Sequence, residues 1–111
     1  EMTVYGEDVG NAVPFAETAY NITSRQKTVE NAVWGIPEWV ATGDHGLAQQ
    51  TPELGSIVQA IEDREDWGTG NSMVFILLPS GSTGDETSSS GGREAEAGPG
   101  DDAAILTVIY D

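Results

Sequence analysis

The sequence predicts a mainly β fold, a β-sandwich module in which several short strands are combined with a single helix. Apolar residues are concentrated in a few stretches of four to eight residues with β-branched and aromatic character, among them MVFILL and AAILTVIY. Glycine and proline border these stretches, which is typical of strands ended by turns. Only one part of the chain, at about residues 51–65, repeats its apolar residues with the period of an α-helix.

The predicted strands are short and spread along the chain. Residues 2–5 (MTVY) have strand composition, and Gly6 is expected to end them. Further strands are expected where β-branched and aromatic residues gather. These segments are Ala19–Thr23, a short one that begins at Val33 and is interrupted by Gly35 and Pro37, Ser72–Leu78 between Gly70 and Pro79, and Ala104–Tyr110. Residues 42–50 have the composition of a loop.

The predicted helix begins with a recognisable start signal. Thr51 is a good N-cap residue, and Pro52 at the first helical position loses no hydrogen bond. The apolar stripe of this helix follows the i, i+3, i+4, i+7 pattern in Leu54, Ile57, Val58 and Ile61. We expect the helix to end near residues 64–65, because Gly68 and Gly70 oppose its continuation.

Chain length and net charge limit the classes of protein to which this sequence can belong. The 111 residues are expected to form one module, or a fragment of one, with residues 79–102 as a flexible Gly/Ser/acidic loop within it. A net charge of −15 opposes binding to nucleic acid and to anionic membranes, and no apolar stretch approaches the roughly 20 residues of a membrane span. The charge is explained either by solubility or by attraction of divalent cations, mineral surfaces or a basic partner. The absence of cysteine removes thiol chemistry and disulfides.

The sequence offers little catalytic chemistry, and we predict that the chain is not an enzyme. His45 is the only histidine, its neighbour Asp44 cannot form a triad with it, and no nucleophile-elbow motif is present. A cleft with two converging carboxylates would be needed to support a hydrolase. No cofactor is expected. Calcium is a candidate ligand, because it binds several carboxylates on flexible loops, here Glu94, Glu96, Asp101 and Asp102.

Aromatic residues and an asparagine sequon offer two further kinds of candidate site. Trp34, Trp39 and Trp67 could stack on sugar rings, although a role in packing is the commoner use of such residues and is favoured here. Phe15, Tyr20 and Tyr110 are likewise expected to pack against the sheet. Asn21 begins an Asn-Ile-Thr sequon, which would carry a glycan if the chain were secreted from a eukaryotic cell and the site were exposed.

The order of the motifs resembles the DNRLRE-type extracellular domains, which are related to carbohydrate-binding modules. The matching motifs cover nearly the whole chain: YGED at 5–8, NAVPF at 11–15, the Trp-x-x-Pro-x-Trp pattern at 34–39, TPEL at 51–54, IVQ at 57–59, REDW at 64–67, Gly70–Asn71, the apolar run 73–78, Arg93, and LTVIY at 106–110. The chain departs from the family in having Ala97–Gly98 where a Tyr-Asp pair is usual, and in the length of the loop from 79 to 92.

The resemblance implies a jelly-roll-like β-sandwich, present in this chain either as a module or as its second half alone. It implies an extracellular, secreted location and a non-catalytic structural or adhesion role, binding a surface polysaccharide or a partner protein within a larger secreted protein or assembly. The alternative is an acidic structural component of an extracellular matrix, filament or mineral-associated assembly. In either case another polypeptide or an upstream segment is expected to supply the missing strands, because a half-sandwich exposes sheet edges and an apolar face.

Overall fold

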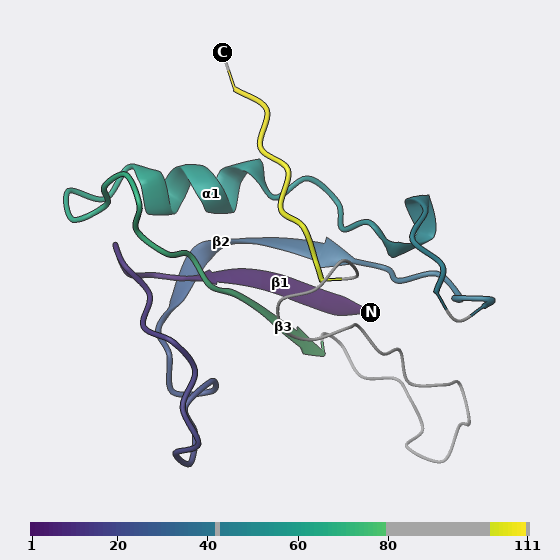
Figure 1. Ribbon diagram of the computed structural model, residues 1–111, viewed down its shortest axis with the longest axis horizontal. Coiled ribbons are helices and arrows are strands. Elements are labelled where there is room, and N and C mark those ends of the chain that lie inside the picture. Colours follow the sequence, from purple (N-terminus) through teal and green to yellow (C-terminus); the bar gives the residue numbers. More distant parts are fainter. Residues whose placement is uncertain (42, 80–102, 111) are drawn as a thin grey trace.

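A three-stranded antiparallel sheet and one helix make up the regular structure. The computed structural model describes residues 1–41, 43–79 and 103–110. Its elements are β1 (Met2–Glu7), β2 (Lys27–Trp34), the short 3-10 helix η1 (Leu47–Gln49), α1 (Gly55–Glu62) and β3 (Phe75–Pro79), with the sheet order β2-β1-β3. Figure 1 shows α1 along one side of the strands and the long β1–β2 connection extending from the other side. The predicted combination of short strands with one helix is confirmed at this level.

The central strand β1 pairs with both neighbours along its whole length. Val4 lies opposite Ala32 of β2 and Leu77 of β3, so these three side chains share the face that α1 covers. The pairing with β2 shifts register between Tyr5 and Glu7, which is a β-bulge. At the bulge, the Thr28 hydroxyl accepts the Gly6 N–H at 3.0 Å in place of a regular ladder bond.

The core lies between α1 and β1 and is small. Ile57 and Ile61 of the helix are fully buried and contact Val4, and the half-buried Leu54, Trp67, Met73 and Phe75 surround them. Gly6 allows the helix to approach the strand, because a Cβ atom there would lie 2.7 Å from Ile57 Cγ2 and 2.8 Å from Ile61 Cδ1. The predicted apolar stripe is therefore the face of the helix that packs on the sheet.

The helix is shorter than the start and stop signals predict. Leu54, rather than Thr51, is its N-cap, because the Leu54 carbonyl is the first acceptor and bonds the N–H groups of Ile57 and Val58. The helix begins at the point where Leu54 packs against the core formed by Val4, Ile57 and Ile61. At the other end α1 stops at Glu62, and residues 63–66 continue as turns and a bend.

Three strand predictions need correction. Residues 19–23 form turns instead of a strand, as the next section explains, and residues 33–34 end β2 instead of beginning a strand. Residues 104–110 are exposed and belong to no strand of the described structure. The strands at 2–5 and 72–78 are confirmed with shifted ends, as β1 and β3. The described residues form a single sheet, so the sandwich remains a prediction, and the expected loop at 79–102 lies, apart from Pro79, outside the described residues.

Candidate binding loop

A folded loop between β1 and β2 presents apolar side chains to solvent on a rigid support. We call residues 13–24 the Tyr20 loop. Its backbone is closed by local hydrogen bonds, with Asn21 N–H donating to the Thr18 carbonyl at 3.2 Å and Ser24 N–H donating to the Tyr20 carbonyl at 2.9 Å. The Asn21 side chain adds a third closure, because its Oδ1 accepts the Ala16 N–H at 3.0 Å. The loop is thus a defined structure with its own hydrogen-bond network.

Arg25 anchors the Tyr20 loop to the sheet. Its side chain is buried and donates at 2.7 Å to Glu7 Oε2, which is itself buried at the end of β1. The same guanidinium donates to the Val13 and Pro14 carbonyls at 2.9 and 3.1 Å. It also donates to the carbonyl oxygen of Asn21 at 2.9 Å and to Asn21 Oδ1 at 3.3 Å. One planar cation therefore joins both arms of the loop to a strand of the sheet.

Tyr20 has a backbone conformation that only a supported loop retains. Its φ of 62° makes it the one non-glycine residue in the left-handed region among residues 1–41, 43–79 and 103–110. For a bulky residue this conformation costs on the order of 1–2 kcal/mol relative to the right-handed region. The hydrogen bonds from Asn21 and Ser24 on either side of the turn, with the anchor at Arg25, hold it in place. This also explains why 19–23 is not a strand.

The loop exposes the apolar side chains that the sequence predicted would pack against the sheet. Tyr20 is 78% exposed and Phe15 58% exposed, and Val13 and Ile22 are also exposed. The Phe15 ring lies under the Arg25 guanidinium, with 4.7 Å from the ring centroid to Cζ, so one face of this ring is fixed while the side chain stays accessible. The prediction that Phe15 and Tyr20 are buried is wrong.

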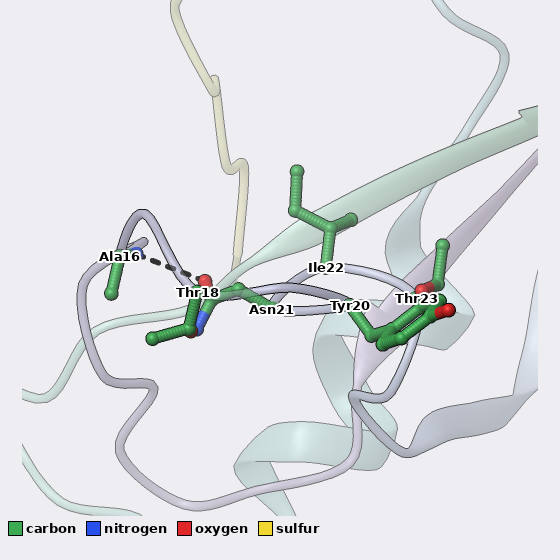
Figure 2. Close-up of a pocket in the computed structure, with 6 residues that line it drawn as sticks. All are labelled: Ala16, Thr18, Tyr20, Asn21, Ile22 and Thr23. Carbon is green, nitrogen blue, oxygen red and sulfur yellow. Dashed lines mark hydrogen bonds between the residues drawn. The ribbon is translucent and has the colours of Figure 1, made fainter.

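A surface hollow runs along this loop. Figure 2 shows the residues that line it, with the Tyr20 ring and Thr23 drawn at one end of the loop, Thr18 at the other, and Ile22 projecting away from the backbone. Thr18 and Thr23 contribute hydroxyl groups and Asn21 an amide group to a lining that also includes the aliphatic Ala16 and Ile22 and the aromatic Tyr20. Ring, methyl and hydroxyl groups together suit a ligand with one apolar face and polar edges, such as a pyranose ring.

A second arginine holds the start of the β1–β2 connection against the turn after α1. Arg64 donates to Asp8 Oδ1 at 2.7 Å and to both carboxylate oxygens of Asp66 at 2.8 and 3.2 Å. Asn71 donates to the Gly10 carbonyl at 2.8 Å, and a Cβ atom on Gly10 would lie 2.4 Å from the Asp66 carbonyl oxygen. The close approach of these two segments thus requires glycine at position 10.

The hydrogen bonds between Arg64 and Asp66 shift the pKa values of both groups in the direction that favours their charged forms. The hydrogen bonds that Arg64 donates to Asp66 and, next in size, to Asp8 raise the pKa of Arg64 above its ordinary value. The hydrogen bond from Arg64 lowers the pKa of Asp66 below its ordinary value. These groups are solvent-exposed, so they orient the turn without adding much to stability. Asp66 and Asp8 are therefore both engaged by Arg64.

The three tryptophans lie in three separate segments and are all half-buried. Trp34 ends β2 opposite Met2, and Trp67 packs against the core in the turn after α1. Trp39 lies in the extended segment after β2, and its indole N–H donates to the Ala48 carbonyl at 3.0 Å. The favoured packing role is confirmed for Trp67.

The remaining predicted site residues are either outside the described structure or engaged locally. Glu94, Glu96, Asp101 and Asp102 lie outside the described residues, as does Arg93. Within the described ranges no group of three potential metal ligands is found. His45 is exposed, with Nδ1 2.9 Å from the Gly43 carbonyl oxygen. Tyr110 is exposed instead of packed against the sheet. No helix in the described ranges is both long and apolar enough to cross a membrane.

Sequence reasoning assigned no role to Arg25 and placed Tyr20 in a strand. One signal was available: Arg25 is one of only four basic residues in an acidic chain, and it follows a segment with Pro14 and Asn21, residue types that favour turns. Comparisons of the chain with protein-family models, with curated proteins and with solved structures found no match.

Proposed function

We propose that this chain is a non-catalytic extracellular adhesion module that binds a surface polysaccharide through the Tyr20 loop. The observation that supports the proposal most is Tyr20 itself, an exposed aromatic residue in a strained backbone conformation on a loop fixed by Arg25. An exposed ring adds nothing to the core. The free-energy cost of its backbone conformation is therefore consistent with a role outside the fold. Rigid loops on a scaffold are the usual place for binding residues.

The charge of the loop supports a neutral ligand. Glu17 is the only charged residue from 13 to 24, whereas the whole chain carries a net charge of −15. A neutral polysaccharide can approach this surface without the repulsion that the rest of the chain exerts on anions. Stacking of a sugar ring on Tyr20, with hydroxyl contacts from Thr18 or Thr23, is the binding mode that we propose. A partner protein is the other ligand class that an exposed apolar loop fits.

Replacement of Tyr20 tests this proposal. We expect Tyr20→Ala to weaken binding to immobilised neutral polysaccharides at least tenfold, which corresponds to about 1.4 kcal/mol and is usual for a central aromatic residue. Tyr110→Ala is the matched control, because Tyr110 is equally exposed but lies outside the loop. Affinity electrophoresis against a panel of neutral glycans measures both. Equal retention of the wild type and Tyr20→Ala would contradict the proposal, as would equal losses in both variants.

Tyr20→Gly separates binding from folding. Glycine adopts a φ of 62° without strain, so this variant should unfold at a urea concentration no lower than Tyr20→Ala while losing the aromatic ring. We therefore expect it to be folded and unable to bind. A variant that keeps its affinity without the ring would show that Tyr20 is not a contact residue.

A second candidate function is that of a structural component of an acidic extracellular matrix, filament or mineral-associated assembly. In this proposal the sheet belongs to a jelly-roll sandwich that another polypeptide or an upstream segment completes. The observation that favours it is the exposed apolar segment 104–110, which belongs to no strand in the described ranges although its sequence is typical of one.

A further inference from the structure

The strand β3 lies at the edge of the sheet but has the composition of a central strand. Within residues 1–41, 43–79 and 103–110 it pairs only with β1. Its first four residues, Phe75 to Leu78, are all large and apolar, so both faces of the strand are apolar. Such runs are typical of strands that are covered on both faces, and an apolar strand left at an edge is a template for pairing with another strand. Only Pro79, at its last position, opposes pairing.

The other edge of the sheet is protected against such pairing. The strand β2 carries the charged residues Lys27 and Glu30, and Glu30 is exposed, as are Val29 and Val33 of the same strand. Charged side chains of this kind are the usual means by which natural proteins discourage edge-to-edge association. The contrast between β2 and β3 singles out the β3 edge as the one that can accept a further strand.

The segment 104–110 is a strand sequence without a sheet in the described structure. Ile105, Ile109 and Tyr110 are more than four-fifths exposed, while Leu106 and Val108 are about half exposed. Four of the residues from 104 to 110 are β-branched, which is typical of a strand, and the exposure of the apolar side chains leaves a large apolar surface in contact with water. In Figure 1 this segment leads away from the three strands and ends beyond α1.

We propose that residues 104–110 of one copy of this chain pair with the outer edge of β3 in a second copy. This inference rests on the second proposed function and names the assembling partner. Each copy carries both an apolar edge strand, β3, and an apolar strand sequence, 104–110. Two copies can therefore each pair their 104–110 segment with the β3 edge of the other. Charge favours the same pairing, because residues 72–79 and 103–110 contain no charged side chain in a chain of net charge −15. Two copies can therefore meet at these segments with the least mutual repulsion.

The first test is the association of the chain and its dependence on the 104–110 backbone. We expect native mass spectrometry to show dimers or larger species that increase with salt, because salt screens the repulsion between acidic copies. Successive N–H groups of a strand point to opposite edges, so one of the two variants Thr107→Pro and Val108→Pro removes an N–H that faces β3 and should weaken association at least tenfold. Val108→Thr keeps the N–H and the branched side chain, so it should associate like the wild type. Association of both proline variants equal to that of Val108→Thr would overturn the strand pairing.

The second test identifies which copy supplies the strand. The chain has no cysteine, so engineered thiols report a single contact. Leu77→Cys, on β3, is mixed in turn with single-cysteine variants at each position from 105 to 109 and oxidised. We expect a mixed disulfide dimer at one or two of these positions, because a disulfide forms only when the two Cα atoms lie within about 7 Å.

Each other outcome has a distinct meaning. Double-cysteine variants, with Leu77→Cys and one of the same positions from 105 to 109 on one chain, are oxidised in parallel. A disulfide that forms in these chains but not between two single-cysteine chains would overturn the exchange, because the strand would then pair within its own copy. Association without any mixed disulfide would overturn the strand pairing and leave the assembly function standing. A chain that stays monomeric at all concentrations and salt levels would contradict self-assembly and this inference together.

Discussion

Replacement of Arg25 is the sharpest test of how this fold is held together. The Arg25 and Glu7 side chains are only 5% and 9% exposed and lie 2.7 Å apart, and Arg25 donates five hydrogen bonds in all. Arg25→Ala leaves the buried Glu7 carboxylate and three loop carbonyls, those of Val13, Pro14 and Asn21, without their donor. Breaking a buried pair on one side costs about 3–5 kcal/mol, a large part of the roughly 5–15 kcal/mol that stabilises a small domain.

The assay is urea unfolding followed by tryptophan fluorescence. With a slope of about 1–3 kcal/mol per molar urea, this loss should lower the midpoint by about 2 M, or abolish the cooperative transition. Arg64→Ala is the matched control, because Arg64 is likewise paired with carboxylates, those of Asp8 and Asp66, but its side chain is 32% exposed. Exposed pairs contribute little, so its midpoint should change much less. Equal shifts in the two variants would refute the anchoring role of Arg25.

Two further predictions concern close packing and pH. Gly6→Ala should lower the free energy of unfolding by about 1–3 kcal/mol, because the added Cβ would overlap Ile57. Gly35→Ala is the control and should change the free energy little, because a Cβ there meets no atom within 4 Å. Thermal unfolding measures both variants. The hydrogen bond from Arg64 lowers the pKa of Asp66 in the folded state, so its contribution is present above the unfolded value, near 3.8, and is lost as pH falls through the lower folded value. The difference in urea midpoint between the wild type and Asp66→Asn should therefore be constant from neutral pH to about pH 5 and vanish in acid, and a difference that grows in acid would contradict this pairing.

Local patterns predicted the parts of the fold that depend on local physics. The apolar stripe with Ile57 and Ile61 identified the buried face of α1, and the run before Pro79 identified β3, because period and composition are set by the burial of each segment. The strand predicted at 19–23 failed for the opposite reason. Its conformation is determined by hydrogen bonds that Arg25 makes across the loop, and no property of the segment itself encodes them.

The candidate site was missed for a related reason. An aromatic residue such as Tyr20 is more often buried than exposed, and only the observed backbone angle and exposure distinguish the two cases. The helix start was misplaced because Thr51 and Pro52 carry a start signal that the chain does not use. The helix begins where Leu54 can pack against the core, so tertiary contact overrides the local preference.

The two arginines in the described structure both hold the YGED turn that ends β1. Arg25 binds Glu7 from the loop side, and Arg64 binds Asp8 from the helix side. The two consecutive acids are therefore held by arginines from different segments of the chain. A chain with four basic residues thus uses two of them at one corner of the sheet. The rest of the chain is left with a large excess of negative charge, which repels anions and other copies. Contact with a ligand or a second copy is then most favourable at the weakly charged Tyr20 loop and at the uncharged segments 72–79 and 103–110, which is where the proposed interactions lie.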